Sequence, residues 1–186
     1  MASLEIVLYP DPFLTKRARE IKPEEIAAGV ADGWNLAELV ERMKETMYSA
    51  EGIGLAAPQV RVGLRIFVID ITKEHNDFRV FLNPTLSDLH GTVVDEEGCL
   101  SIPRVRAKVK RSETITIKAV DLKGQPVEYN ATELFARVCQ HEFDHIDGKL
   151  FINRLGPAGK FLIRKQLAEL EDDYDLEQAK KKREKK

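Results

Sequence analysis

Apolar side chains recur with two different periods along the chain, and each period predicts a different kind of element. Between residues 36 and 50 they recur every three or four positions, which predicts a helix with one apolar face. The side chains on this face are Leu36, Leu39, Val40, Met43 and Met47. Asn35, three residues before Glu38, resembles a capping box at the start of this helix.

The middle of the chain contains short runs with the composition of β-strands. They cover residues 64–71, 78–83, 105–110, 114–121 and 126–131. The sequence Asp-Leu-Lys-Gly at 121–124 indicates a hairpin turn between the last two runs. Few helices lie between these runs to serve as parallel crossovers, so we expect the sheets to be mostly antiparallel.

Helices are also expected near the end of the chain. Residues 130–148 have a helical pattern, with Asn130 and Glu133 as a capping box and Gly148 as a stop. A last amphipathic helix is expected from about Lys160 to Gln178, and residues 21–35 are expected to form a loop. The predicted class is therefore α+β: mostly antiparallel sheets around a central helix, followed by a C-terminal helix.

Length and composition favour one globular domain. The 186 residues are 43% hydrophobic and 32% charged, and the net charge of -2 gives no bias toward nucleic acid, so no DNA partner is expected. We expect a catalytic domain over residues 1–178 and a basic, disordered tail over 179–186. The chain shows no membrane-length apolar run and no secretory leader at its start, so a cytoplasmic location and no membrane partner are expected.

Residues 140–145, Gln-His-Glu-Phe-Asp-His, contain the strongest chemical signal. Positions four apart lie about 40° apart around a helix, so His141 and His145 can aim at one point. This is the H-E-x-x-H arrangement, in which two histidines bind a metal ion and the glutamate, here Glu142, acts as general base. Cys139 lies about 200° around the helix from His141 and cannot join the same ion.

The residues alone leave the third metal ligand open. The pattern H-E-x-x-H-x-x-G-x-x-H is followed as far as Gly148, but Phe151 stands where its third histidine belongs. Glu169 or Glu171 in the last predicted helix would make a metallopeptidase site. Cys99, in a non-helical stretch, would make a Cys/His/His site with an open fourth position, which is typical of catalytic zinc.

Three stretches together resemble the peptide deformylase family. Its motifs G-x-G-L-A-A-x-Q, E-G-C-L-S and Q-H-E-x-D-H occur here in order, as residues 52–59, 97–101 and 140–145. The resemblance covers almost the whole chain. It implies that the chain removes the formyl group from the N-terminal formylmethionine of new proteins and releases formate.

The resemblance also implies roles for residues of these motifs. Cys99, His141 and His145 would hold one divalent metal ion, which is Fe²⁺ natively and Zn²⁺, Ni²⁺ or Co²⁺ in some preparations. Glu142 would move the proton of the attacking water. The Gln59 side chain and the Leu100 backbone N–H would stabilise the oxyanion.

Other residues are expected around the substrate. Gly54 would bind its backbone as an extended chain, and an apolar pocket would take the methionine side chain. The candidates for its wall are Ile53, Leu134 and Val138, the last two of which could equally be core residues. Arg137 lies near the same helical face, where it would guide the substrate or cover apolar surface.

Glu97 is expected to orient the Cys99 loop, paired with Arg106 or Arg111. The expected partners are N-formylmethionyl nascent chains and, through the C-terminal helix and its basic tail, ribosomal RNA. Two other functions stay open: a metallopeptidase with a downstream glutamate ligand, and a structural metal site. Structural sites are usually closed by four protein ligands, whereas only three converge here.

Overall fold

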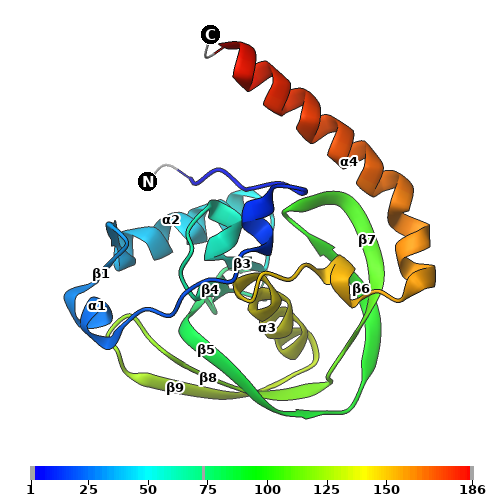
Figure 1. The fold of residues 1–186 in the computed structure, drawn as a ribbon. Helices are drawn as coiled ribbons and strands as arrows, with labels where there is room; N and C mark the ends of the chain where they lie inside the picture. Colours follow the sequence, from blue (N-terminus) through cyan, green and yellow to red (C-terminus); the bar gives the residue numbers. More distant parts are fainter. Residues whose placement is uncertain (1–2, 73, 185–186) are drawn as a thin grey trace.

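The computed structural model describes residues 3–72 and 74–184, and its fold is α+β, as the sequence predicts. Helix α3 lies in the middle of the molecule with strands curving around it, and α4 projects from the body (Figure 1). The helices are α1 (Pro23–Ala28), α2 (Leu36–Ser49), α3 (Glu133–Ile146) and α4 (Pro157–Glu184), with 3-10 turns η1 (Pro12–Thr15), η2 (Ala57–Val60) and η3 (Phe151–Arg154). The strands are β1 (Val30–Ala31), β2 (Trp34–Asn35), β3 (Gly54–Ala56), β4 (Ile66–Ile69), β5 (Arg79–His90), β6 (Val93–Cys99), β7 (Ile102–Arg111), β8 (Thr114–Val120) and β9 (Pro126–Thr132).

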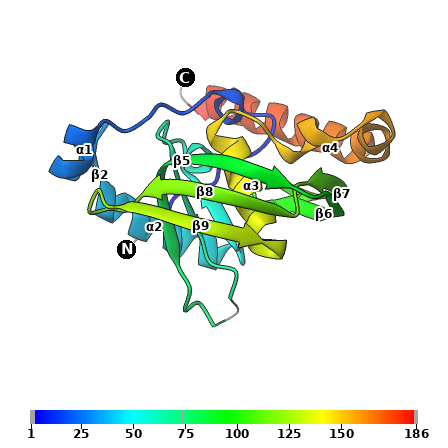
Figure 2. The ribbon, with the colours of Figure 1, turned by 90° about the horizontal axis from the view of Figure 1, so that it is seen from below.

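The main sheet has five antiparallel strands in the order β3-β4-β5-β8-β9. Strand β5 is long enough to pair with β4 over its first residues and with β8 along most of its length, with register shifts in between. Strands β5, β8 and β9 lie side by side, with α3 on one side of them (Figure 2). Strand β3 is at one edge of this sheet, so one side of its backbone has no neighbouring strand among the residues that the structure describes.

Strands β6 and β7 form a separate two-stranded sheet. Their register places Cys99 opposite Ile102 at the tight end of the hairpin, after a register shift between Glu97 and Cys99. Helix α4 packs against β7. The hairpin therefore carries the Cys99 segment toward α3 from a different sheet than the one that carries β3.

The buried apolar residues form three clusters around these layers. One joins α2 to β3 and β4, with Met43 and Met47 fully buried. A second packs α3 on the main sheet and includes Phe67, Phe81 and Cys139. Cys139 is completely buried there, as a small apolar side chain, which agrees with its exclusion from the metal site. The third lies between β7, η3 and the first turns of α4.

Most predicted elements are present with shifted ends, but two predictions are wrong and two further strands of the sheets are missing from the prediction. The predicted loop 21–35 contains α1 and the two short strands β1 and β2. The predicted capping box at Asn130 does not form, because that residue belongs to β9 and α3 begins at Glu133, after Thr132. The strands β3 and β6 were not predicted.

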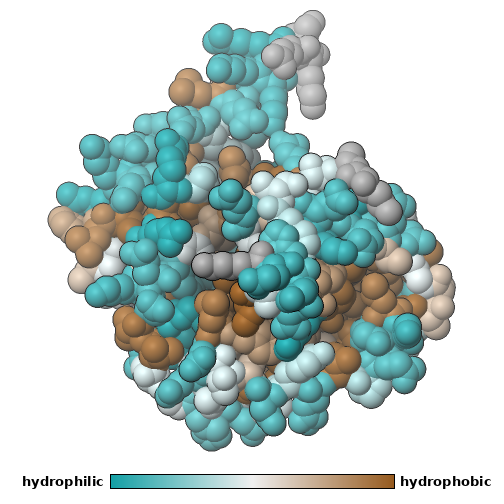
Figure 3. Space-filling model, turned by 180° about the vertical axis from the view of Figure 1, so that it is seen from behind, coloured by the Kyte–Doolittle hydropathy of each residue, from teal (hydrophilic) through white to brown (hydrophobic). Residues whose placement is uncertain are grey.

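The C-terminal helix is longer than predicted. Helix α4 continues through Glu184, so residues 179–184 of the predicted disordered tail are helical, and residues 185–186 lie outside the described part of the chain. The space-filling view shows the projecting end of α4 as largely hydrophilic (Figure 3). Among the described residues, none of the helices is both long and apolar enough to span a membrane.

Candidate metal centre

Helix α3 presents both motif histidines on one face. His141 and His145 are one helical turn apart, and their ring centroids are 5.1 Å from each other. The helix ends at Ile146, with Gly148 in the left-handed conformation (φ +70°) just beyond it, as the sequence predicts. A side chain at position 148 would collide with the backbone of Thr15, because its Cβ would lie 2.5 Å from that carbonyl oxygen.

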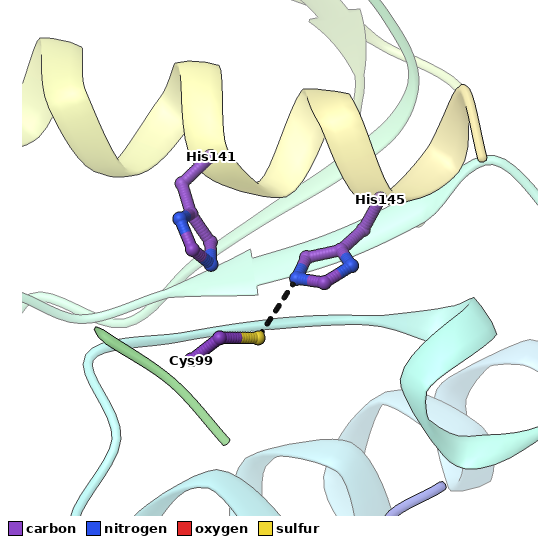
Figure 4. A group of neighbouring side chains, drawn as sticks. All are labelled: Cys99, His141 and His145. Atoms are coloured by element: carbon purple, nitrogen blue, oxygen red, sulfur yellow. Dashed lines mark hydrogen bonds between the residues drawn. The ribbon is translucent and has the colours of Figure 1, made fainter. Parts of the chain in front are cut away.

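Cys99 comes to the same point from the end of β6. Its Sγ lies 3.3 Å from Nε2 of His145, and the three side chains point toward one another (Figure 4). One ligand atom from each of Cys99, His141 and His145 lies within 4.8 Å of the others. A thiolate and two imidazoles with a fourth position open are a known donor set for a catalytic divalent ion.

The electrostatics around these three side chains also fit a cation. Burial lowers the pKa of His145 well below its ordinary value, so its ring is neutral at pH 7, which is the form that binds metals. Burial lowers the pKa of His141 too, but hydrogen bonds with Cys99 and Glu97 outweigh burial and raise that pKa to about 10. The acidic groups around His141 therefore favour positive charge at this point.

Glu142 lies beside the histidines with its carboxyl group buried. Burial is the main cause that raises the pKa of Glu142 to about 7. Within residues 3–72 and 74–184, its Oε2 atom has no hydrogen-bond partner. A side chain at Gly54 would collide with it, because the Cβ would lie 2.4 Å from the other carboxyl oxygen. Glycine therefore lets β3 pass this close without displacing the Glu142 carboxyl group or the Val138 side chain.

The amide of Gln59 is buried on the other side of Cys99. Its Oε1 atom accepts the backbone N–H of Ala56 at 2.9 Å. Its Nε2 atom lies 3.2 Å from Oγ of Ser101 and 3.5 Å from Sγ of Cys99. The donor side of the amide therefore faces the point where the three ligand atoms converge.

Glu97 supports His141 from behind. Its Oε2 atom lies 3.0 Å from Nδ1 of His141, and both carboxyl oxygens accept from Arg111 at 2.9 Å. Burial alone would raise the pKa of Glu97, but these partners outweigh it and hold that pKa below its ordinary range. Of the two partners expected for Glu97, Arg111 makes the contact, whereas Arg106 lies 3.5 Å from Glu96 instead.

Two further residues belong to this charged network. Arg137 is buried and donates to Glu97 at 2.6 Å, so its guanidinium is held there. Asp144 accepts from Arg111 at 2.6 Å and also pairs with Arg154. No role for Asp144 follows from the sequence, although this residue lies inside the motif between the two histidines, because nothing in the spacing shows which arginines would reach it.

A cavity of about 560 Å³ opens beside the metal centre. Its lining includes His141, Glu142, Cys99 and Leu100. The four residues expected to contact the substrate also line it, namely Ile53, Gly54, Leu134 and Val138. Ile53 and Leu134 are 40% and 47% exposed, so both are available to a ligand, whereas Val138 is mostly buried and also packs in the core.

The downstream glutamates lie away from this centre. Glu171 accepts a hydrogen bond from the hydroxyl of Tyr9 at 2.5 Å, and Glu169 lies 3.9 Å from Lys165 on the same helix. Neither belongs to the group of converging ligand atoms. The geometry therefore gives no support to a glutamate from α4 as the third ligand.

Comparisons with known proteins agree on one family. The sequence model described as polypeptide deformylase matches residues 3–161. A peptide deformylase from Stenotrophomonas maltophilia (strain R551-3) is 46% identical over 168 residues, which are 90% of this chain and 96% of that protein. A relative of the same description from Thermodesulfovibrio yellowstonii is 43% identical and covers 89% of this chain and 97% of its own.

Solved structures of that description have the same fold. The crystal structure of a peptide deformylase from Legionella pneumophila is 38% identical, covers 96% of this chain and 98% of its own, and has a TM-score of 0.81. A peptide deformylase from Plasmodium falciparum is 34% identical, covers 92% and 98%, and has a TM-score of 0.83.

Proposed function

Because the chain belongs to the polypeptide deformylase family, we propose that Cys99, His141 and His145 hold the metal ion on which its activity depends. Members of the family are metal-dependent hydrolases that remove the formyl group from the N-terminus of newly made proteins, and this is the activity of the chain. One observation supports the residue assignment above all: Cys99, His141, Glu142 and Gln59 line one cavity, and the ligand atom of His145 lies within 4.8 Å of those of Cys99 and His141.

The metal ion, when bound, supplies a Lewis acid that polarises a carbonyl oxygen and makes water a nucleophile near neutral pH. The proposed native ion is Fe²⁺, with Zn²⁺, Ni²⁺ or Co²⁺ as substitutes in some preparations. A cysteine thiolate and two imidazoles accept any of these ions. A thiolate next to ferrous iron is sensitive to oxidation, so activity is best measured in protein purified without oxygen.

Glu142 carries the proton in this reaction. Its unpartnered Oε2 atom accepts the proton of the attacking water and then delivers it to the departing amine. A general base works best when its pKa is close to the working pH, and burial raises the pKa of Glu142 to about 7. The burial that isolates this carboxyl group therefore also suits it to both steps.

Gln59 and Leu100 stabilise the negative charge that develops on the formyl oxygen. Such donors act best when they are fixed before the reaction, in a site with little water. Gln59 is fixed by its hydrogen bond with Ala56 and lies buried beside Cys99. Leu100 follows Cys99 directly, so its backbone N–H is carried by the same turn as the metal ligand.

The substrate chain binds along β3, in an extended conformation. The free edge of this strand at Gly54 offers backbone groups for hydrogen bonds, and the missing side chain lets the substrate come close to Glu142. The methionine side chain enters the cavity between Ile53, Leu134 and Val138. The two exposed residues of this set offer apolar surface that a methionine would cover.

A cytoplasmic location and contact with the ribosome are part of the same proposal. Helix α4 projects from the body and has Lys181, Lys182 and Arg183 in its last turn. Basic side chains at an exposed end attract RNA phosphates, and this attraction weakens as salt rises. Deletion of residues 180–186 is expected to weaken association with ribosomes, most clearly at low salt; unchanged association would exclude a contact through this segment.

The test of the function is formate release from an N-formylmethionyl peptide by protein loaded with Fe²⁺ under nitrogen. The N-acetyl peptide is the control substrate. Cys99→Ala should lose both metal affinity and activity, whereas Glu142→Gln should lose most turnover and keep its metal ion and its fold. Peptide-bond cleavage that survives in Cys99→Ala would favour the metallopeptidase alternative instead.

A further inference from the structure

Ser101 is a completely buried polar residue next to the proposed oxyanion site. It lies two residues after Cys99, and its hydroxyl oxygen is 3.2 Å from Nε2 of Gln59. It does not line the cavity, so it is not placed to touch a substrate. Its hydroxyl is therefore available to act on the reaction only through Gln59.

The orientation of the Gln59 amide is fixed by its partners. The backbone N–H of Ala56 can only donate, so it requires the carbonyl oxygen of the amide at that end. The NH₂ group then faces Ser101 and Cys99, and it has two hydrogens for these two acceptors. Without substrate, both hydrogens are thus directed at protein atoms, so one of these contacts must be given up when the amide binds a substrate oxygen.

The two contacts differ in quality. The contact with the Ser101 hydroxyl, at 3.2 Å, joins two groups that are both buried. The contact with Cys99, at 3.5 Å, is longer because sulfur is larger than oxygen; unlike the contact with Ser101, it is only partly buried, and Cys99 lines the cavity. The contact with sulfur also points toward the metal centre and the cavity. It is therefore the contact that a substrate oxygen would replace.

The backbones of both residues are held by one segment. The N–H of Val7 donates to the carbonyl oxygen of Gln59, and the N–H of Tyr9 donates to that of Ser101, each at 2.8 Å. Residues 7–9 bond to the backbone of both Gln59 and Ser101. The fold therefore sets the distance between the Ser101 hydroxyl and the Gln59 amide. This is the arrangement expected for a fixed anchor.

We propose that Ser101 is a positioning residue that permanently holds one N–H of the Gln59 amide, so that the other N–H exchanges between the Cys99 sulfur and the formyl oxygen of the substrate. The inference rests on the proposed function of Gln59. It assigns a different role to each hydrogen of one amide. The first stays bonded to Ser101, and the second bonds to the formyl oxygen when negative charge develops there. Without the anchor, the amide would keep its contact with Ala56 but could rotate its NH₂ group away from the reacting oxygen.

The main test is a double-mutant cycle between Ser101→Ala and Gln59→Met, which keeps the volume of the side chain without the amide. Removal of one oxyanion donor costs about 100-fold or more in turnover, so loosening one should lower kcat about 10-fold and leave KM within about 2-fold. In the Gln59→Met background, Ser101→Ala should have no further effect on kcat. Equal effects of Ser101→Ala in both backgrounds would overturn the proposal, because a general structural role is additive.

Matched variants distinguish the loss of the contact between Ser101 and Gln59 from a general loss of protein stability. Thr46→Val removes another buried hydroxyl, which bonds to Leu4 and Arg42 and does not line the cavity, and should leave kcat unchanged. Ser101→Thr keeps the hydroxyl and should retain most of the turnover. Should Ser101→Ala fail to fold, Ser101→Gly removes the same hydroxyl without adding bulk and replaces it in the cycle.

A measurement that does not depend on turnover tests the contact between Ser101 and Gln59 separately from the proposed function. The two Nε2 protons of Gln59 can be identified by NMR, since their signals vanish in Gln59→Met. Loss of the Ser101 hydroxyl should speed their exchange with water, whereas unchanged signals would overturn the anchor. If the wild type released no formate, the proposed function would fail, and the NMR result would still decide whether Ser101 holds the amide.

Discussion

Helices α3 and α4 both carry acidic and basic side chains, but they place them in opposite surroundings. In α3, Arg137 and Asp144 are buried and each is paired with partners from other elements. In α4, the pair of Glu177 and Lys181 is about half exposed and lies within one helix. A buried charge must keep its partner, because burial without one is very costly. An exposed charge has water as a substitute.

The two helices also differ in how their polar side chains relate to the candidate metal centre. The network of α3 holds His141 directly, through Glu97. Helix α4 instead contacts the N-terminal segment, where Tyr9 bonds to Glu171 and Asp11 to Tyr174. We therefore expect substitutions among the buried charges around α3 to cost far more stability and metal affinity than substitutions among the contacts of α4.

The largest effect is expected from Arg111→Met. This change removes the guanidinium that Glu97 and Asp144 share, and so it should lower the free energy of unfolding by about 3–5 kcal/mol. It should also weaken metal affinity about 10–100-fold, because Glu97 no longer holds His141 in place. Urea denaturation and metal titration measure the two effects. Arg106→Met, at the exposed pair with Glu96, is the control and should change little.

Arg137→Met should have a smaller effect in the same network. Arg137 donates to Glu97 and to the backbone oxygen of Val109. When Arg137 is replaced, Glu97 still has its ion pair with Arg111. We expect a loss of about 2 kcal/mol in urea denaturation, the range for hydrogen bonds to charged groups. Metal affinity should stay close to that of the wild type. A loss of affinity equal to that of Arg111→Met would show that the two arginines are not separable.

Asp11→Asn tests the support from the N-terminal segment. Burial raises the pKa of Asp11, but the N–H of Phe13 and the guanidinium of Arg61 outweigh burial and lower that pKa. A lowered pKa stabilises the fold above the unfolded-state pKa of about 3.9, and this stability is lost as pH falls through the folded-state pKa. The variant should lose about 1 kcal/mol at pH 7 and show a shallower loss of stability below about pH 4.

Urea denaturation of the wild type and Asp11→Asn at a series of pH values checks this prediction. The difference in unfolding free energy between the two proteins should shrink as the solution becomes more acidic. A constant difference across the series would mean that the Asp11 carboxylate contributes through packing alone.

Glu177→Gln should have the smallest effect. Glu177 and Lys181 are 2.7 Å apart, and each is 51% exposed, so water screens the pair and it contributes little to stability. Thermal unfolding at low and high salt measures it. A destabilisation comparable to that of Arg137→Met would remove the distinction between the two helices.

The sequence predicts elements that have a local pattern of apolar residues, and it misses elements that depend on distant partners. The face of α2 was predicted because its apolar residues recur with the helical period, and the helix is observed at Leu36–Ser49. Strand β6 was missed, because most of its residues are exposed and its sequence, Val-Val-Asp-Glu-Glu-Gly-Cys, has no alternating pattern. Its existence depends on pairing with β7, which no local pattern records.

The site divides in a similar way. The two histidines and Glu142 are evident from helical spacing, and Cys99 followed from a resemblance to a known family. The pairing of Glu97 with Arg111 was one of two options, and only the register of β6 with β7 decides between them. The roles of Asp144 and Ser101 had no signal, because a single polar residue does not reveal its distant partner. Long-range contacts of this kind require the fold.

The free edge of β3 has a consequence for the state of the client protein. An edge strand can pair only with a backbone whose N–H and C=O groups are not already bonded. An N-terminus that has coiled into a helix has its C=O groups bonded internally and is no longer extended, and one that has joined a sheet shares its groups with its neighbours. In the proposed binding mode, deformylation is therefore in competition with folding, and a client that folds its first residues early would keep its formyl group.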